Sequence, residues 1–329
     1  HLDNLGRWMM ARAPALARSY AALIAPGEPN LRVRPGWRFA EEYYDHRQWL
    51  ACRRGAIWEA AARYKFLMPM TLPWYDGTTV EVTLGNDNSL CLYVCGSFEP
   101  NEFALLDRVL RPGMTFIDVG ANDGYYTLFA ARRVGRLGRV VAVEPSTRER
   151  VHLRRNVKRN SLDNVSIVAA ALGASNSVAD LRLAHGVHAG HNTFGRFAHD
   201  GVQADSLEQV SVETLDKVVA NLDLSRVDFI KIDVEGAEAS VIDGARTVLT
   251  KMRPMILLEV NDSALRAQGS SAEVLLDTLR RAFNYEIMVF SPETGLIERL
   301  TESAPLSANV VAMPSERTAE LLPAPGLDR

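Results

Sequence analysis

The segment at residues 115–126, which reads Thr-Phe-Ile-Asp-Val-Gly-Ala-Asn-Asp-Gly-Tyr-Tyr, constrains the fold more than any other stretch of the sequence. A short apolar run leads into Asp118 and a loop with two glycines, and a helical pattern begins directly after the loop. This order predicts a parallel strand that ends in a tight loop, with a ligand held on the backbone of that loop.

The composition of the loop indicates what kind of ligand it suits. A dinucleotide site would carry Gly-x-Gly-x-x-Gly, so that a diphosphate can approach the helix N-terminus, but Asn122 occupies the second glycine position. One carboxylate and few glycines suit an amino-acid-like ligand better than a diphosphate. S-adenosylmethionine (SAM) fits, because it carries an ammonium, a carboxylate and a sulfonium.

Later apolar runs also end in carboxylates. An acid at the second strand end of a nucleotide-binding half is placed to accept both ribose hydroxyls. Parallel strands end at one edge of a sheet, so we expect these acids to gather there and to attract a cationic sulfonium. The acids at the strand ends are Asp118, Glu144 as the last residue of the run at 139–144, Asp233 as the last residue of the run at 227–233 with Glu235 shortly after it, and Glu259 within 255–260.

Alternating strand and helix patterns predict an α/β fold with a mostly parallel sheet and right-handed crossovers. Two final runs, at 285–290 and 308–313, are typical of a closing antiparallel pair. The expected strands of the central sheet are 115–119, 139–144, 165–170, 178–183, 209–213, 227–233 and 255–260, and the expected helices are 103–110, 124–135, 146–160, 214–221, 236–250 and 271–283.

The first hundred residues follow a different pattern. Helical periodicity at 3–24 and 37–65 predicts a helical arm, and residues 66–95 predict a small region of antiparallel strands with a hairpin turn at Asp76-Gly77. Cys91 and Cys95 alternate with apolar residues, so we expect both in a strand with their side chains in the core.

Composition excludes several classes of protein. The formal net charge of −3 over 329 residues argues against general nucleic-acid affinity, and three cysteines give neither a disulfide framework nor a metal-ligand array. No run reaches the ~18 apolar residues that span a bilayer, and no signal peptide is evident. We therefore expect a cytoplasmic protein without a membrane span.

Several motifs occur together and in a fixed order. They are residues 118–125 (Asp-Val-Gly-Ala-Asn-Asp-Gly-Tyr), 143–145 (Val-Glu-Pro), 156–164, 170–173 (Ala-Ala-Leu-Gly), 231–238 (Lys-Ile-Asp-Val-Glu-Gly-Ala-Glu) and the lead-in at 96–102. Together they resemble the FkbM-type SAM-dependent methyltransferases over roughly residues 76–262, and the Lys-Ile-Asp-Val-Glu-Gly string is the most specific of them.

The resemblance implies a Rossmann-like class I methyltransferase fold, SAM as cofactor with S-adenosylhomocysteine as product, and usually O-methylation of a hydroxyl. It leaves the substrate open among macrolides, sugars and other small metabolites. We expect a helical arm at 1–65 that acts as a lid or a homodimer contact, a methyltransferase domain at 66–313 and a tail at 314–329.

Within such a domain, Asp118 would contact the methionine part of SAM directly or through water, and Glu144 would hold the ribose hydroxyls. Ala170 and Ala171 would flank the adenine, and Asp233 would lie near the methionine ammonium or the acceptor. The expected cofactor-binding residues are Asp118, Gly120, Asn122, Gly124, Tyr125, Glu144, Pro145, Ala170, Ala171 and Asp233.

Three residues are candidates for catalysis: Glu235, His191 and Asp233. Glu235 either takes the acceptor proton or caps the following helix. His191 lies in a segment with three histidines, and an imidazole can take a hydroxyl proton, although this segment also fits a solvated loop. Mg²⁺ is not expected; if present, its ligands would be Asp233, Glu259 and Asn261.

Other functions stay open. One is methylation of nitrogen or of a macromolecule, which a basic arm favours for a carrier-bound or nucleic-acid substrate, although the net acidity disfavours nucleic acid. Another is a non-catalytic SAM-binding scaffold, which the intact carboxylates at the strand ends oppose. A nicotinamide oxidoreductase is opposed by Asn122.

Overall fold

The computed structural model describes residues 13–37, 49–185, 188, 191–195, 204–301 and 306–320. Parts of three sequence-based predictions therefore lie outside the described residues. These parts are the first half of the helix at 3–24, residues 38–48 of the helical stretch at 37–65, and the tail beyond 320.

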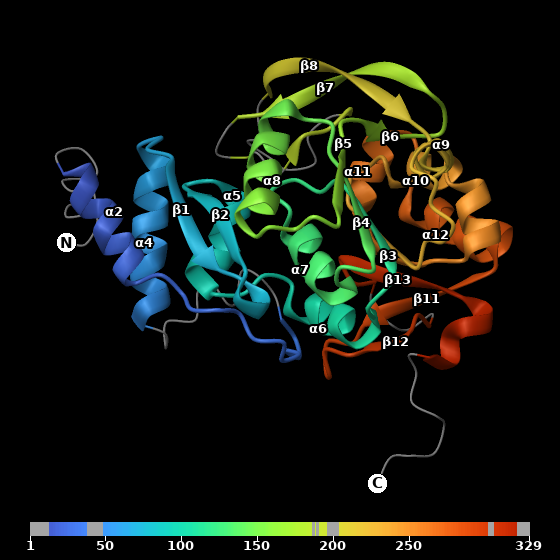
Figure 1. The fold of residues 1–329 in the computed structure, drawn as a ribbon, viewed down its shortest axis with the longest axis horizontal. Helices are drawn as coiled ribbons and strands as arrows, with labels where there is room; N and C mark the ends of the chain where they lie inside the picture. Colours follow the sequence, from blue (N-terminus) through green and yellow to red (C-terminus); the bar gives the residue numbers. More distant parts are fainter. Residues whose placement is uncertain are drawn as a thin grey trace, which may run out of the picture.

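An eight-stranded sheet forms the centre of the molecule, in the order β12-β11-β13-β10-β9-β3-β4-β5 (Figure 1). The five strands from β10 to β5 run parallel, and β13 pairs antiparallel with both β10 and β11. The predicted α/β sheet with an antiparallel closing pair is confirmed. The strands are β3 (Thr115–Val119), β4 (Arg139–Val143), β5 (Val165–Val168), β9 (Phe229–Ile232), β10 (Met255–Glu259), β11 (Tyr285–Phe290), β12 (Ile297–Arg299) and β13 (Asn309–Pro314).

Side chains alternate between the two faces of this sheet, as the two-residue period of a strand requires. Phe116 and Phe229 stack on one face, where they belong to the core that includes helices α6 and α7. Ile117 and Ile230 belong to the core on the other face, with α9, α10 and α12. The helices are α6 (Pro100–Val109), α7 (Tyr125–Val134), α8 (Thr147–Arg159), α9 (Leu215–Asn221), α10 (Glu238–Asp243), α11 (Asp262–Ala267) and α12 (Ala272–Phe283).

Two predicted strands lie outside the central sheet. β7 (Ser177–Ala184) and β8 (Ala204–Glu213) pair antiparallel and join β6 (Ala171–Leu172) in a separate three-stranded sheet. The prediction that 178–183 and 209–213 belong to the parallel sheet is therefore wrong. Both strands expose much of one side, including Val178 and Leu207, whereas a strand within the central sheet is covered on both faces.

The region before the central sheet begins with a hairpin. β1 (Met68–Pro73) and β2 (Thr79–Leu84) are antiparallel, and the turn between them has positive φ at Asp76 and Gly77, so the predicted hairpin is confirmed. The strand predicted around Cys91 and Cys95 is wrong: α5 (Asp87–Leu90) runs into a π-helical turn at Cys91–Cys95. Asn86 caps α5 by accepting the Asn88 N–H at 2.9 Å, which favours a helical start over a strand.

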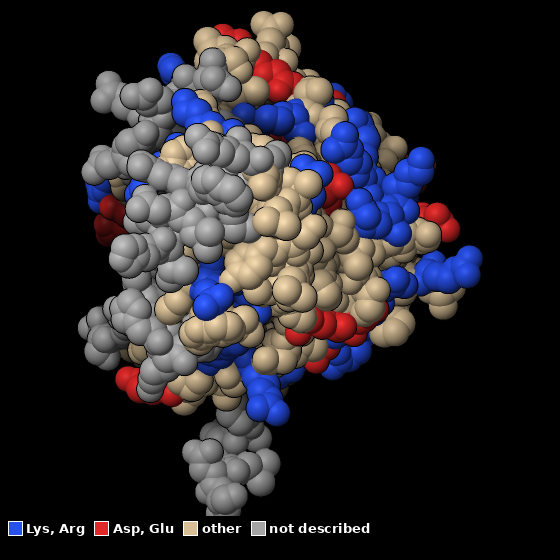
Figure 2. Space-filling model, turned by 90° about the vertical axis from the view of Figure 1, so that its left-hand side faces the viewer, with Lys and Arg blue, Asp and Glu red and all other residues tan. Residues whose placement is uncertain are grey.

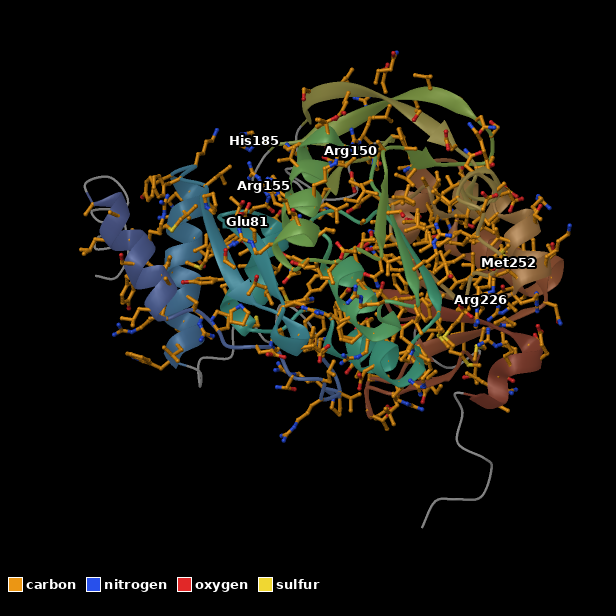
Figure 3. The ribbon with its side chains drawn as sticks, in the orientation of Figure 1. Glu81, Arg150, Arg155, His185, Arg226 and Met252 are labelled. Carbon is orange, nitrogen blue, oxygen red and sulfur yellow. The ribbon has the colours of Figure 1, made fainter. Side chains whose placement is uncertain are left out.

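Hydrogen bonds from helix α8 and from Asn160 directly after it connect the hairpin to the central domain. Glu81 on β2 accepts hydrogen bonds from Arg155 at 3.3 Å and Arg159 at 3.0 Å, and Figure 3 shows Glu81 and Arg155 in this region. Asn156 accepts the backbone N–H of Glu81 at 2.7 Å, and Asn160 accepts that of Thr79 at 2.9 Å. The asparagines of the 156–164 motif thus have structural partners.

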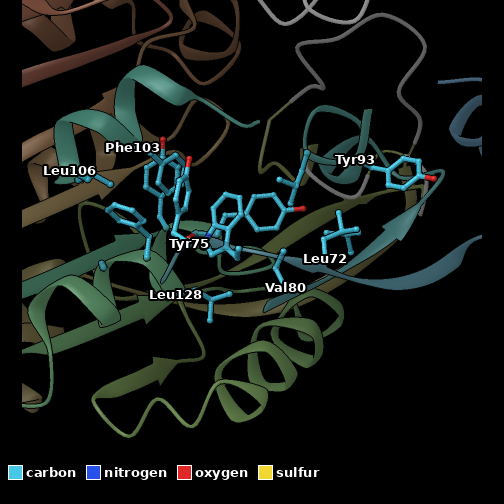
Figure 4. Packing of buried hydrophobic residues seen from close by; sticks show 14 of the residues in the cluster. Leu72, Tyr75, Val80, Tyr93, Phe103, Leu106 and Leu128 are labelled. Atoms are coloured by element: carbon cyan, nitrogen blue, oxygen red, sulfur yellow. Dashed lines mark hydrogen bonds between the residues drawn. The ribbon is translucent and has the colours of Figure 1, made fainter. Parts of the chain in front are cut away.

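The N-terminal helices α2 (Pro14–Leu23) and α4 (Trp49–Arg63) lie beside the hairpin (Figure 1). Their buried residues, such as Ala21 and Ala61, belong to the same apolar core as the hairpin and α7, and Figure 4 shows part of that core. The domain boundary at residue 65 stays a prediction. No helix in the described part of the chain has both the length and the apolar character needed to cross a membrane.

Candidate active site

A cavity of about 690 Å³ opens at the carboxyl ends of the parallel strands. The loops after β3, β4 and β9 line it, together with the end of β10, helix α5 and the segment at 191–194. This is the edge at which ligands bind in open α/β sheets.

The loop after β3 follows the cavity wall closely because of its glycines. Gly120 has φ +79°, and a Cβ there would lie 1.9 Å from the carbonyl oxygen of Asp233. Gly124 has φ +91°, and a Cβ there would lie 2.6 Å from Cδ1 of Leu153. Any larger residue at Gly120 would force this loop away from the end of β9.

Glu144 is held from behind by two backbone amides. Its Oε2 accepts the N–H of Asn122 at 2.9 Å, and its Oε1 accepts the N–H of Ser146 at 2.8 Å. Burial raises the pKa of Glu144 to about 7, while these hydrogen bonds act in the opposite direction. The carboxyl group also lines the cavity, so its remaining lone pairs are available to a ligand.

Lys231 supplies a positive charge between two strand-end acids. Its Nζ lies 3.1 Å from Oδ2 of Asp233 and 3.9 Å from Oδ1 of Asp118, and it donates to the carbonyl of Gly120 at 3.3 Å. Burial lowers the pKa of Lys231, but Asp233 and Asp118 outweigh it and raise the pKa above its usual value. The amine therefore stays charged and ties β9 to the loop after β3.

Asp118 lies behind this lysine and is not among the residues that line the cavity. It is fully buried, and its Oδ2 accepts the hydroxyl of Thr127 at 2.6 Å. A direct contact between Asp118 and a ligand in the cavity is therefore not supported. The contact through water, which was the other expectation for Asp118, stays a prediction.

Two more acids, Glu99 and Glu259, line the cavity. Glu99 accepts hydrogen bonds from the hydroxyl of Tyr126 and from Nδ2 of Asn309, the latter at 2.9 Å, and burial raises its pKa. Burial, and then the nearby Asp233, raise the pKa of Glu259 well above its usual value. Both groups sit in a field that favours a bound cation.

His191, which also lines the cavity, lies between two carboxylates. Its Nδ1 is 3.1 Å from Oε1 of Glu235, and its Nε2 is 3.6 Å from Oδ2 of Asp87. Burial lowers the pKa of His191, but hydrogen bonds to Asp87 and Glu235 raise it to about 9. The imidazole is therefore mainly protonated at neutral pH, and its hydrogen bond helps to lower the pKa of Asp87.

The structure brings most of the predicted site residues to this one cavity. Asn261 is elsewhere: it caps α11 by accepting the N–H of Ala264 at 3.2 Å, so the Mg²⁺ ligand set considered above is not assembled. Within the described ranges, no group of three or more His, Cys, Asp or Glu side chains is arranged to hold a metal. The predicted residues that line the cavity are Gly120, Asn122, Gly124, Tyr125, Glu144, Pro145, Ala170, Ala171, His191, Asp233, Glu235 and Glu259.

The cavity residues that the sequence did not predict include three charged ones: Lys231, Asp87 and Glu99. Lys231 carried a usable signal, because it is the one charged residue within the apolar Phe229–Ile232 strand. Asp87 gave no signal, because it lies within residues 66–95, which were predicted to be a small region of antiparallel strands. Glu99 lies in the lead-in motif, but nothing in that motif indicated that its side chain would reach the cavity.

Comparison with known proteins gives one family. The model of the methyltransferase FkbM domain matches residues 118–287. The AMB antimetabolite synthetase AmbE of Pseudomonas aeruginosa is 30% identical over 205 residues, which cover 53% of this chain and 10% of the synthetase. The 2-O-methyltransferase NoeI of Sinorhizobium fredii is 27% identical over 184 residues, or 51% of this chain and 72% of that protein.

Solved structures give weaker matches. Methyltransferase FkbM from Methylobacillus flagellatus is 15% identical with a TM-score of 0.38, over 69% of this chain and 55% of that one. An O-methyltransferase from Bacillus cereus, solved in complex with S-adenosylhomocysteine, is 13% identical with a TM-score of 0.38, over 65% of this chain and 79% of that one. The chain thus spans about a tenth of the length of AmbE and about half of the Methylobacillus chain.

Proposed function

Because the chain belongs to the methyltransferase FkbM family, whose methyl donor is SAM, we propose that it methylates a hydroxyl group of a small metabolite. The observation that carries this proposal is a single cavity with two different walls. We call Glu144 and the Gly120 loop the first wall, or cofactor wall, and His191 and Glu235 the second wall, or acceptor wall; all of them line the cavity. A relative with 27% identity bears the name 2-O-methyltransferase, which favours a hydroxyl acceptor.

The first wall has the groups that SAM requires. Glu144 is fixed by backbone amides and can accept the ribose hydroxyls, while the backbone of residues 120–124 can follow the methionine part. Ala170 and Ala171 offer small apolar surfaces to the adenine. Asp233, already paired with Lys231, can accept the ammonium.

The second wall can receive the acceptor and its proton. In methyl transfer a bond forms between the acceptor oxygen and the methyl carbon, the carbon–sulfur bond breaks, and sulfur leaves as a neutral thioether. The hydroxyl must lose its proton to a nearby base. His191 is mainly protonated at neutral pH, so the carboxylate of Glu235, 3.1 Å from its Nδ1, is the better proton acceptor.

The remaining acids of the cavity suit this chemistry as well. Asp233 is paired with Lys231, and Glu99 and Glu259, whose raised pKa values favour their neutral forms, line the same cavity. A cationic sulfonium bound there favours ionisation of the two glutamates and so gains from all three acids. The same field disfavours an anionic acceptor. A neutral hydroxyl compound meets no such penalty.

We propose in addition that the helical arm forms a homodimer contact. Helices α2 and α4 expose large apolar side chains, among them Leu23 at 82% and Trp49 at 63%. Figure 2 shows the face at this end of the molecule, where uncharged surface lies between scattered Lys and Arg side chains. Sedimentation velocity of the full chain and of Leu23→Ser/Trp49→Ser tests the contact: a dimer that dissociates in the variant supports it, and a monomeric parent excludes it.

Product analysis tests the proposed reaction. The full chain is incubated with SAM and a panel of alcohols, sugars and amines, and products are read by mass spectrometry. We expect a methyl group to replace the hydroxyl proton of one compound, which raises its mass by one CH₂ unit, and S-adenosylhomocysteine to form in equal amount. Methylated amines alone would favour the N-methyltransferase alternative, and SAM binding without any product would favour the scaffold.

A matched variant separates catalysis from cofactor binding. Glu235→Gln keeps the shape of the side chain but removes its basicity, and we expect kcat to fall by roughly 10²–10⁴ because general-base catalysis contributes about that factor. SAM affinity should stay within a few-fold of the parent. Asp243→Asn, an exposed change outside the cavity that also removes one carboxylate, serves as the control.

A further inference from the structure

Helix α5 contacts both walls of the cavity through two neighbouring residues. Asp87 reaches the acceptor wall, where its Oδ2 lies 3.6 Å from Nε2 of His191 and 2.5 Å from Nδ1 of His188. Asn88 reaches the cofactor wall, where its Nδ2 donates to Oδ1 of Asn122 at 2.9 Å. Asp87 and Asn88 both line the cavity.

The helix that carries these residues is fixed from several sides. Asn86 caps its first turn, and the hydroxyl of Tyr125 donates to the carbonyl of Asn88 at 3.0 Å. The backbone next to Asp87 is thus fixed by the Asn86 cap and by the start of α7. Asp87 lies outside residues 118–287, the part of the chain that matches the family model.

The ring of His191 has a carboxylate at each nitrogen. Glu235 approaches Nδ1 and Asp87 approaches Nε2, and a ring that donates to both must carry both protons. All three side chains are less than one-third exposed, at 24% for His191, 16% for Glu235 and 29% for Asp87. Water therefore competes only in part for these contacts, and the two acids define the plane of the ring.

We propose that Asp87 is a positioning residue of the acceptor site, which holds His191 in the orientation that places its Nδ1 against Glu235. Asp87 does not itself touch the acceptor proton. It keeps His191 cationic and fixed, and the contact with His191 in turn holds the carboxylate of Glu235 in place beside the cavity. The segment before the family domain thereby completes the active site.

Electrostatics agree with this geometry. The charged or titratable groups that face His191 include Asp87, Glu235 and His188, whose ring centre is 6.4 Å from that of His191. Burial raises the pKa of Asp87, but hydrogen bonds from His191 and His188 outweigh it, and its pKa is lowered overall. An ionised Asp87 is what the proposed role requires.

The proposal depends on the proposed function only for the role of Glu235 as proton acceptor. The first test therefore measures the titration of His191 and needs no methyl-transfer reaction. The full chain is labelled with ¹⁵N-histidine, and the His191 resonances are assigned by their loss in His191→Gln. We expect His191 to titrate near pH 9 in the parent. In Asp87→Asn its titration should move down by about one unit or more, because a neighbouring carboxylate is lost.

Controls keep this test decisive. Asp243→Asn removes an exposed carboxylate elsewhere and should leave the titration unchanged. Asp87→Glu should retain part of the shift, and it replaces Asp87→Asn if that variant does not fold. Titration of His191 near pH 6.5 in the parent, or an unchanged titration in the variant, would overturn the proposal.

The second test uses the acceptor identified by product analysis. In Asp87→Asn we expect kcat to fall about 10- to 100-fold, because a small misplacement of a catalytic group has effects of that size. The dissociation constant for SAM should change less than twofold. If the parent binds SAM but methylates nothing, the proposed function fails, and the histidine titration still decides whether Asp87 positions His191. If the parent is active, an unchanged kcat in Asp87→Asn would contradict the positioning role.

Discussion

The carboxylate of Glu144 accepts the backbone N–H of Asn122 at 2.9 Å, and this bond joins the end of β4 to the loop after β3. The other carboxylate oxygen accepts the N–H of Ser146 at 2.8 Å. One side chain therefore fixes two of the loops that line the cavity. Its position relative to the Gly120 turn is set before any ligand binds.

This arrangement makes Glu144→Gln a sharp test of the cofactor wall. An amide has only one acceptor oxygen, so its NH₂ group must face the N–H of either Asn122 or Ser146. We expect SAM affinity to fall roughly 10- to 100-fold, since a hydrogen bond to a charged group contributes about 1.5–3 kcal/mol. Titration calorimetry measures this, with Asp163→Asn on the surface as control. Unchanged affinity in a folded variant would contradict a ribose-binding role for Glu144.

The raised pKa values of two buried glutamates make the stability of the protein depend on pH. Burial raises the pKa of Glu102 to about 8 and that of Glu238 to about 7. Both values lie above the usual value of a glutamate, so between about pH 5 and 8 the folded state binds more protons than the unfolded state. The contribution of these two groups to the free energy of unfolding is fully present below their pKa in the unfolded state. It is lost as the pH rises through their folded-state values of about 7 and about 8.

We therefore expect Tm to fall between pH 5.5 and pH 8.5. Glu102→Gln should reduce the slope, because its amide stays neutral at both pH values. Calorimetric scans of the two proteins across this range make the measurement. A Tm that rises with pH, or an equal slope in the variant, would show that these groups are ionised in the folded protein.

Lys231→Met tests the charge between the strand ends. Removing the amine leaves Asp118 buried without its neighbouring cation, and breaking a buried ion pair costs about 3–5 kcal/mol. We expect a loss toward the lower part of that range, because Asp233 is partly exposed. The double variant Lys231→Met/Asp118→Asn should recover part of the loss. Chemical denaturation measures both, and a double variant less stable than the single one would contradict this account.

Gly120→Ala tests how closely the loop after β3 approaches β9. A Cβ there would lie 1.9 Å from the carbonyl oxygen of Asp233, at a φ that disfavours any L side chain. We expect a loss of roughly 2–5 kcal/mol from strain and overpacking, together with weaker SAM binding. Gly27→Ala is the control, because nothing lies within 4 Å of a Cβ built there. Equal effects of the two changes in denaturation experiments would contradict the close packing.

Local patterns were sufficient to predict most strands of the central sheet and the edge at which the cavity forms. Apolar runs that end in acids, such as those before Glu144 and Asp233, signal buried parallel strands, because such strands are covered on both faces. Their ends must meet at one edge of the sheet. The cavity accordingly contains most of the residues that were predicted from strand ends.

Contacts between distant segments could not be predicted in the same way. Asp87 and His191 are 104 positions apart in the sequence, and neither lies at the end of a strand of the central sheet. Their meeting depends on how α5 packs against the loop after β3, which is a tertiary property. The pairing of β7 with β8 in a separate sheet is also a tertiary property. The local sequence of each strand fitted a place in the central sheet equally well.

The central claim is that one cavity holds the donor against Glu144 and presents its methyl group to Glu235 and His191. A crystal structure of the full chain with S-adenosylhomocysteine measures this directly. The account predicts ribose hydroxyls within hydrogen-bond distance of Glu144 and the sulfur on the side of the cavity that faces Glu235. A ribose bound away from Glu144, or a sulfur turned away from Glu235, would contradict it.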